Sequence, residues 1–307
     1  MIAAILAKKI VSLFIIMGMG YVLVKLKILK STDSKILSLI MLNLLIPCAI
    51  IMAFQVEYTD EIKEGLIFAF IIAIIIHVAL IMISELLGRV FHFDGVERNS
   101  IIISNAANLI IPIVISILGN EWVVYATGFM CVQLIVLWTY GKMTLCGETK
   151  PEIKKIVTNV NLIAVVVGLL LFITQIHIPE IIKDSINSVS LLVGPVGMLI
   201  TGMLIAGMNL KRIFTYKRIW IVTACRLVIN PLLAVGLMKY TGVAGWAANG
   251  TTILLISLLA TSTPSAASIT AMSQIYGQDA EYASAINVIT TVLCIATMPL
   301  VVMLYQM

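Results

Sequence analysis

The chain is dominated by apolar stretches that are each long enough to cross a lipid bilayer. A membrane-spanning helix needs roughly 20 mostly apolar residues to cross about 30 Å of hydrocarbon. Hydrophobic residues make up 61% of the 307 residues and charged residues only 11%, a balance outside the range of soluble globular domains. The sequence therefore predicts an all-α membrane protein with ten transmembrane helices. These lie at about 4 to 26, 34 to 54, 65 to 87, 99 to 118, 121 to 142, 156 to 175, 186 to 208, 218 to 240, 246 to 274 and 281 to 305.

Two of these stretches, the fourth and the ninth, contain a proline close to polar residues. Pro112 follows Asn105 in the fourth stretch, and Pro264 lies within the polar run 262 to 265 of the ninth. Proline removes a backbone donor, and in hydrocarbon the freed carbonyls must be satisfied by protein or by water in a cavity. We therefore predict two broken helices that cross near the membrane midplane. New half-helices are expected to begin after Pro112 and Pro264.

Matching prolines divide the chain into two similar halves. Pro47 in the second stretch corresponds to Pro195 in the seventh, and Pro112 corresponds to Pro264, with one offset of about 150 residues. Five stretches in each half would force the second copy to insert upside down. The sequence thus predicts two inverted five-helix repeats, at residues 1 to 150 and 151 to 307, joined within 147 to 152. Ordinary helix kinks are the alternative explanation of the prolines.

Basic residues are concentrated in one set of alternating loops, as expected for the cytoplasmic side of a membrane protein. That set holds fourteen Lys and Arg residues, whereas the opposite set, with the N-terminal residues, holds five. We therefore expect a multi-pass protein of the cell membrane with both termini outside. The net charge of +5 suits contact with anionic membrane lipid and requires no nucleic-acid partner.

Several short motifs spread over the whole chain resemble those of the auxin efflux carrier family. They are Leu44-Leu45-Ile46-Pro47, Asn105 with Pro112, Gly194-Pro195, Gly207-Met208-Asn209-Leu210, Arg226 to Pro231, Ser262-Thr263-Pro264-Ser265-Ala266, Tyr276-Gly277-Gln278-Asp279 and Thr297-Met298-Pro299-Leu300. The chain departs from the family pattern at Asn108, at Ile110 and at Val160 after Asn159, which bears on the substrate more than on the fold.

The resemblance implies a secondary transporter for a small organic anion, such as malate, malonate or an auxin-like acid, in the branch of bacterial organic-anion carriers. It also implies a scaffold made of spans 1, 2, 6 and 7, and a transport domain made of spans 3 to 5 and 8 to 10 that moves against it in an elevator-like manner. Relatives of this architecture are often dimers, so a homodimer is a further expectation. A channel, or a sodium-coupled symporter of another small solute, remains the alternative.

The residues themselves also favour an anionic substrate. Half-helices that begin at a break present N–H groups with a partial positive charge, which suits a carboxylate. The candidate substrate-binding residues are Asn105, Asn108, Pro112, Arg226, Ser262, Thr263, Pro264 and Ser265. For the polar residues of the breaks, the alternative is that they satisfy backbone groups freed by the prolines. For Arg226, the alternative is a structural pairing with Glu85 or with carbonyls at helix ends.

The coupling of transport to an ion stays open at this stage. His77 lies deep in the third stretch and is a candidate proton carrier, with a packed core histidine as the alternative. Neither broken helix carries Asp or Glu, so a carboxylate relay is not expected, although backbone and Asn or Ser oxygens can still bind sodium. No cofactor, no metal and no catalytic residues are predicted, because the chain lacks the metal and nucleophile motifs of intramembrane enzymes.

Overall fold

The computed structural model of the protein describes residues 2 to 147, 153 to 208 and 215 to 307. Within these ranges the chain is helical, and the sole β-type pairing is a single bridge between two residues. Of the predicted joint between the halves, at 147 to 152, residues 148 to 152 lie outside the described residues. The same holds for Asn209 and Leu210 of one motif and for three of the predicted cytoplasmic basic residues, Lys150, Lys211 and Arg212.

Helices occupy each of the five apolar stretches predicted in the first half. The second and fifth stretches are continuous helices, each widened by a π-helical turn, at Met41–Leu45 and Leu137–Gly141. The helices are α1 (Ile2–Lys25), α2 (Ser34–Ile40), α3 (Ile46–Ala53), α4 (Asp60–Phe91), α5 (Gly95–Ile102), α6 (Ala106–Ile117), α7 (Val123–Val136) and α8 (Lys142–Cys146).

The second half follows the same order. Its ninth stretch is split into α16 and α17, as the fourth is split into α5 and α6. The helices are α9 (Ile153–Val157), α10 (Val160–Thr174), α11 (Glu180–Ser190), α12 (Val193–Gly207), α14 (Ile219–Ala224), α15 (Asn230–Tyr240), α16 (Gly250–Thr261), α17 (Ala267–Ile275) and α18 (Ala280–Gln306).

Six helical segments of the described chain are long and apolar enough to cross a membrane. They are Ser31–Ala53, Asp60–Phe91, Asn120–Cys146, Glu180–Gly207, Ile219–Tyr240 and Ala280–Gln306. Four shorter apolar helices accompany them, at Val11–Lys25, Asn108–Ile117, Val160–Thr174 and Gly250–Thr261. The chain is therefore a multi-pass all-helical membrane protein, while the full count of ten crossings stays a prediction.

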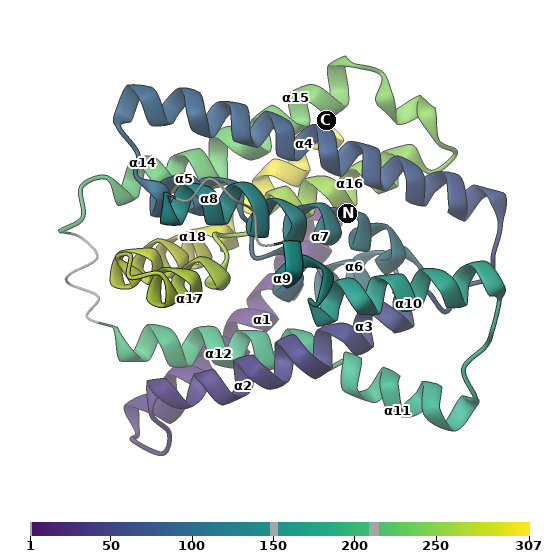
Figure 1. Ribbon diagram of the computed structural model, residues 1–307, viewed down its shortest axis with the longest axis horizontal. Helices are drawn as coiled ribbons and strands as arrows, with labels where there is room; N and C mark the ends of the chain where they lie inside the picture. Colours follow the sequence, from purple (N-terminus) through teal and green to yellow (C-terminus); the bar gives the residue numbers. More distant parts are fainter. Residues whose placement is uncertain (1, 148–152, 209–214) are drawn as a thin grey trace.

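The helices pack as two groups. One group contains α1, α2, α3, α10, α11 and α12, where α1 lies along α12 and α3 lies against both α10 and α11. The close approach of α1 and α12 requires glycine, because a Cβ at Gly202 would overlap the carbonyl of Met17. The other group is built around α4, which packs on α7, α5 and α16. Figure 1 shows α4 and α15 on one side of the molecule and α2, α3 and α12 on the other.

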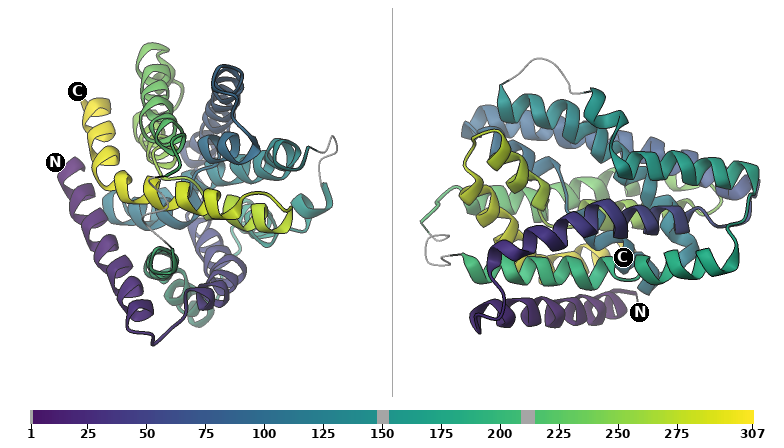
Figure 2. Two further views of the ribbon diagram at one scale, coloured as in Figure 1. Left: turned by 90° about the vertical axis from the view of Figure 1, so that its left-hand side faces the viewer. Right: turned by 60° about the horizontal axis from the view of Figure 1, so that its bottom comes forward.

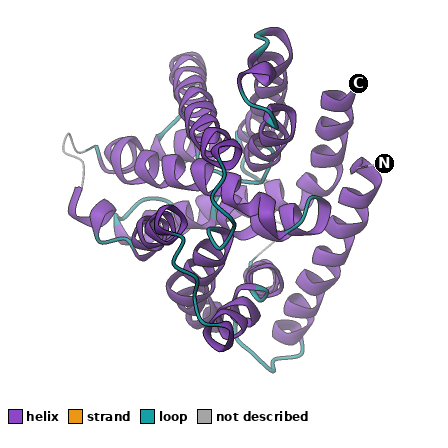
Figure 3. Ribbon diagram, turned by 90° about the vertical axis from the view of Figure 1, so that its right-hand side faces the viewer, coloured by secondary structure: helices purple, strands orange, loops and turns teal. Residues whose placement is uncertain are grey.

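The two ends of the chain lie close together. The N-terminal end of α1 and the C-terminal end of α18 are neighbours in both views of Figure 2 and in Figure 3, and α1 packs against α18.

Candidate functional site

The two helix breaks lie side by side at the centre of the fold, but the first is not where the sequence predicted it. The chain unwinds at 103 to 105, between α5 and α6, whereas Pro112 lies inside α6. The half-helix therefore begins at Ala106 and not after Pro112, so this prediction was wrong. The second break, at 262 to 266, does contain Pro264, and α17 follows it as expected.

The two unwound segments pair with each other as a short antiparallel bridge. Ser104 lies opposite Ser265. The N–H of Asn105 donates to the carbonyl of Pro264 at 2.8 Å, and the N–H of Ala266 donates to the carbonyl of Ile103 at 3.1 Å. Ile103 and Pro264 thus play equivalent parts in the pairing. The counterpart of Pro264 is therefore Ile103, and the predicted equivalence of Pro112 with Pro264 was wrong.

Side chains from the following helices complete the hydrogen bonding of each unwound segment. The side-chain amide of Gln133 in α7 donates to the carbonyl of Ser104 at 2.8 Å and accepts from its N–H at 2.9 Å. In the other half, Asn287 of α18 donates to the carbonyl of Ser265, and Thr290 accepts from the Ser265 N–H at 3.1 Å. Since freed backbone groups at membrane depth must find partners in the protein, these side chains allow both helices to break here.

Arg226 adds a further set of hydrogen bonds to the crossing. Its guanidinium donates to four carbonyls at the C-terminal ends of α5 and α16: Thr263 at 3.0 Å, Ile101 at 2.8 Å, Ile102 at 3.3 Å and Thr261 at 2.9 Å. The side chain is fully buried. The carbonyl end of a helix carries a partial negative charge, so one arginine compensates two helix ends at once.

Local sequence places this arginine. Pro231 has no N–H to donate to the carbonyl four residues earlier, and the helix widens into a π-helical turn at Cys225–Ile229 just before it. Asn230, in the same region, adds a hydrogen bond of 2.7 Å to the carbonyl of Ile101. Of the two alternatives considered for Arg226, pairing with Glu85 was wrong, because Glu85 pairs with Arg98 at 3.0 Å. Pairing with carbonyls at helix ends is what the structure contains.

A cavity of about 280 Å³ lies beside the crossing, between the two helix groups. One wall comes from the second span, α10 and α12, and the other from the breaks, α7 and α17. The polar residues on its wall are Ser38, Ser104, Asn105, Asn108, Gln133, Asn159, Asn161 and Ser268. Most of the remaining wall is aliphatic, with Trp138 as the one aromatic ring among the lining residues that the structure describes.

Two helix N-termini open onto this cavity. Asn105 is the N-cap of α6 and Asn108 lies in its first turn, while Ala266 is the N-cap of α17 and Ser268 lies in its first turn. Helix N-termini carry orphan N–H groups and a partial positive charge of about half an elementary charge each. The described residues of the cavity wall include no charged side chain. The positive potential in the cavity therefore comes from backbone dipoles and from neutral amides and hydroxyls.

Two of the predicted substrate-binding residues, Asn105 and Asn108, line the cavity. Pro112 instead borders a second cavity of about 130 Å³, next to Gly194 in α12. The hydroxyls of Ser262 and Thr263 donate to carbonyls of their own helix, at 2.7 and 2.8 Å. Those two residues, Pro264, Ser265 and Arg226 form the crossing itself and are not among the residues that line the cavity.

His77 lies in α4, away from the cavity wall. Its Nδ1 is 2.7 Å from the carbonyl of Ala73, and its ring packs on Phe129 with 4.6 Å between the centroids. The side chain is 1% exposed, and Nε2 has no hydrogen-bond partner among the described residues. This geometry matches a packed core histidine, with one ring nitrogen unpartnered in the part of the chain that the structure describes.

Sequence reasoning missed the other polar residues of the cavity wall. Gln133 is an isolated amide inside an apolar stretch, which is a usable signal for a polar role at membrane depth. Asn159 caps α10 by accepting from the N–H of Asn161 at 2.9 Å. Asparagine is common at this position of any helix, so the sequence indicates a cap and not a cavity residue. Nothing local indicates that these residues or Ser268 face a common cavity.

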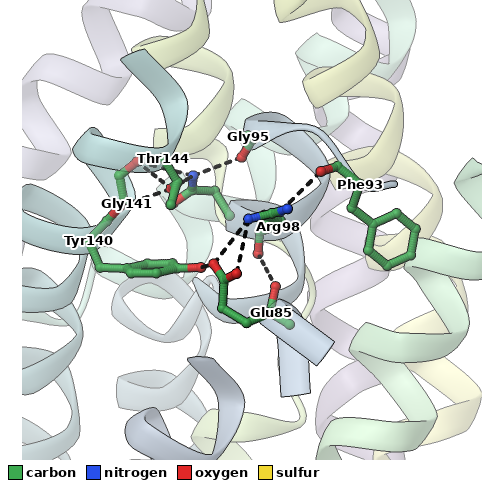
Figure 4. Close-up of polar contacts among 9 residues, drawn as sticks. Glu85, Phe93, Gly95, Arg98, Tyr140, Gly141 and Thr144 are labelled. Carbon is green, nitrogen blue, oxygen red and sulfur yellow. Dashed lines mark hydrogen bonds and ion pairs between the residues drawn. The ribbon is translucent and has the colours of Figure 1, made fainter. Parts of the chain in front are cut away.

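Charged side chains gather at one end of the second helix group and join its members. Arg98 of α5 pairs with Glu85 of α4 at 3.0 Å, and Tyr140 donates to the same carboxylate (Figure 4). Arg218, just before α14, pairs with the buried Glu97 at 3.0 Å, and Tyr282 of α18 donates to Glu97 at 3.0 Å. These contacts fasten α4, α5, α14 and α18, and the π-helical turn after α7, to one another.

Comparison with known protein families gives a match over most of the chain. The model of the family described as "Membrane transport protein" matches residues 5–152 and 142–302. The two matched segments meet close to the predicted joint between the halves. No curated protein matches the chain. The described residues contain no group of three or more His, Cys, Asp or Glu side chains arranged to hold a metal ion.

Proposed function

The chain belongs to the auxin efflux carrier family of membrane transport proteins, and we propose that it carries a small organic anion across the cell membrane by alternating access. The observation that supports an anion most directly is the pair of helix N-termini, of α6 and α17, at one cavity. A carboxylate placed there accepts hydrogen bonds from backbone N–H groups and from Asn105, Asn108 and Ser268. Neutral donors also permit release, because no fixed opposite charge holds the anion.

The walls of the cavity favour one kind of anion. Polar side chains lie on both walls, at the breaks and at Asn159 and Asn161 at the start of α10, but most of the wall is aliphatic, with side chains such as Met41, Leu42 and Leu134. A single carboxylate on an apolar body suits this distribution better than a body with two charged ends. Among the candidates, we therefore place an auxin-like acid ahead of malate and malonate.

The packing supports an elevator-like movement of one helix group past the other. The second group is fastened internally at both ends, by the Glu85 and Glu97 clusters at one end and by the hydrogen bond between Asn249 and Glu61 at the other. Against the first group, α6 meets α12 at two glycines, Gly194 and Gly197. We propose that the first group, spans 1, 2, 6 and 7, is the scaffold, and that spans 3 to 5 and 8 to 10 form the transport domain.

The two breaks are paired in an equivalent way, which supports ten spans in two inverted repeats. Gln133 bonds both backbone groups of Ser104, and Asn287 and Thr290 together bond both backbone groups of Ser265. In this arrangement both termini face outside, and the scaffold is the natural surface for a homodimer. The bacterial organic-anion branch is the proposed placement within the family.

Counterflow in proteoliposomes tests the function. Vesicles are loaded with one carboxylate at a time from a panel that includes malate, malonate and an indole acid, with and without sodium and a pH gradient. We expect saturable exchange, fastest for the acid with an apolar body. Conductance that does not saturate and shows no counterflow would favour the channel, and exchange that requires sodium would favour a symporter.

A pair of matched variants tests the cavity. Asn108→Leu removes an amide from the cavity wall, whereas Asn43→Leu makes the same change on an exposed face of the second span, where the amide bonds its own helix at Leu39. A hydrogen bond to a charged group contributes about 1.5 to 3 kcal/mol, so we expect a KM raised roughly 10- to 100-fold for Asn108→Leu alone. Equal KM values for the two variants would remove Asn108 from the site.

His77 is our candidate for proton coupling, on the strength of its unpartnered Nε2. A proton-coupled cycle through this residue predicts that His77→Gln retains counterflow but no longer responds to a pH gradient. A pH response that is the same in His77→Gln and in the unaltered chain would exclude this role.

A further inference from the structure

Arg226 is a charged side chain inside an apolar membrane helix, at the point where the two broken helices cross. It sits within Ile219–Tyr240, one of the apolar segments long enough to span a membrane, and its side chain is fully buried. In the helices of the second group that the structure describes, the other Lys, Arg, Asp and Glu side chains lie toward the ends of their spans, and Arg226 differs from them in being fully buried at the helix crossing. Glu85, for example, is in the last two turns of α4 and pairs with Arg98.

Within the described ranges, no acidic side chain pairs with Arg226 to cancel its charge. All of its hydrogen bonds go to carbonyls of residues 101, 102, 261 and 263. These carbonyls carry partial charges that belong to helix dipoles, and a dipole has no net charge. Arginine stays protonated in proteins. The crossing therefore has a net charge of +1 at membrane depth, on the helices that we propose to move.

We propose that Arg226 is the charge through which the membrane potential drives the return of the empty carrier. This inference rests on the proposed function. With a monocarboxylate in the adjoining cavity, the moving domain carries the anion and Arg226 together, with a net charge of zero. Without the anion, it carries +1. The loaded domain thus crosses the membrane electric field without net charge movement, and the empty domain moves one positive charge.

This distribution of charge sets the direction of transport. An inside-negative potential pulls the empty, positively charged domain inward, where it is ready to bind another anion, and does not oppose the outward step of the loaded, neutral domain. Each full cycle exports one negative charge. The membrane potential therefore favours export and acts on the empty step.

The test compares two modes of transport by the unaltered chain in proteoliposomes whose potential is set by potassium and valinomycin. Exchange of a monocarboxylate at saturating concentration on both sides uses only the loaded step, and we expect its rate to be the same at 0 and −100 mV. Net efflux also requires the empty step, and we expect it to rise about two- to sevenfold over the same range, depending on how much of the field the charge crosses. The carrier can insert into the vesicles in either orientation, and the potential changes the rate of net efflux in the same direction for both.

Three variants test whether Arg226 carries the charge that responds to the membrane potential. Arg226→Lys retains the charge and should retain the pattern. Arg226→Gln leaves a neutral empty domain and a negative loaded one, so exchange should become sensitive to the potential and the empty step should lose its sensitivity. Arg89→Gln, at an exposed position in the last turn of α4, is the matched control and should behave as the unaltered chain does.

A second measurement avoids any variant that fails to fold. Voltage jumps applied to the unaltered chain without substrate should move charge transiently, and a saturating monocarboxylate should suppress this movement. Exchange that depends on the potential, or an empty carrier that moves no charge, would overturn the proposal while leaving the transport function intact. If no acid of the panel shows counterflow, the proposed function fails, and this inference fails with it.

Discussion

The side-chain amide of Gln133 pairs with both backbone groups of Ser104, at 2.9 and 2.8 Å, and so takes the place of a neighbouring strand. The Ser104 hydroxyl donates to the same amide oxygen. A residue of a separate helix, α7, thus holds the unwound segment that forms part of the cavity wall.

Replacing Gln133 by Leu should therefore damage transport more than it damages folding as a whole. The N–H and C=O of Ser104 would lose buried partners, at a cost of about 1 to 3 kcal/mol each. We expect counterflow to fall at least tenfold, with a lower thermal unfolding temperature in detergent. Gln306→Leu, at the exposed end of α18, is the control and should change neither quantity. Counterflow retained by Gln133→Leu would show that water can replace the amide.

Arg226→Met should strongly destabilise the protein. The four carbonyls that Arg226 bonds would remain buried without donors, and removing one side of such a buried arrangement typically costs about 3 to 5 kcal/mol. Arg226→Lys should recover part of the loss, because an ammonium has three donors but lacks the planar fork of arginine. Thermal unfolding in detergent measures both. A Met variant as stable as the unaltered chain would contradict this account of the crossing.

The pair formed by Arg218 and Glu97 should show coupled effects on stability. Glu97 is 1% exposed, and Arg218 also donates to the carbonyls of Phe91 and His92 at the end of α4. Arg218→Gln leaves a buried carboxylate with fewer donors, and we expect a cost of about 2 kcal/mol, less than for a fully buried pair because Arg218 is half exposed. In the double variant with Glu97→Gln, the total loss should be smaller than the sum of the two single losses. Additive losses in a double-mutant cycle would show that the ion pair contributes nothing.

Gly194→Ala should slow transport. A Cβ at this position would lie 2.8 Å from the Cβ of Pro112, so α6 must move away from α12 and carry Asn108 with it. We expect overpacking to cost about 1 to 3 kcal/mol and exchange to slow roughly tenfold. Gly236→Ala is the control, since nothing lies within 4 Å of its added Cβ, and it should stabilise α15 by up to about 1 kcal/mol. Equal exchange rates in the two variants would argue against a tight contact between α6 and α12.

The course of the helices could be predicted from the sequence because it depends on local composition. Long apolar runs specify helix in hydrocarbon, where the backbone has no other way to satisfy its polar groups, and each predicted stretch is helical in the structure. The polar positions Asn105 and Asn108 were also recognised, because amides are conspicuous in such a run.

The position of the first break could not be predicted in this way, because distant residues determine it. Pro112 is tolerated within α6, and the chain unwinds instead where Gln133 and Pro264 offer partners to Ser104 and Asn105. The role of Arg226 is hidden for the same reason. Its partners are carbonyls more than 30 residues away in the sequence. Because every residue has a backbone carbonyl, the sequence does not indicate which ones an arginine will bond.

The pairing of Ser104 with Ser265 also has a consequence for how the protein is made. When the fourth span leaves the ribosome, the segment that must pair with it has not been synthesised, and at the usual 5 to 20 residues per second it follows after about 10 to 30 seconds. If residues 103 to 105 were unwound during that interval, their backbone groups would have no partners in the membrane, which is a costly state in hydrocarbon. The newly made first half must therefore be sheltered by the insertion machinery or remain helical through 103 to 105, and it unwinds there only when the second half arrives.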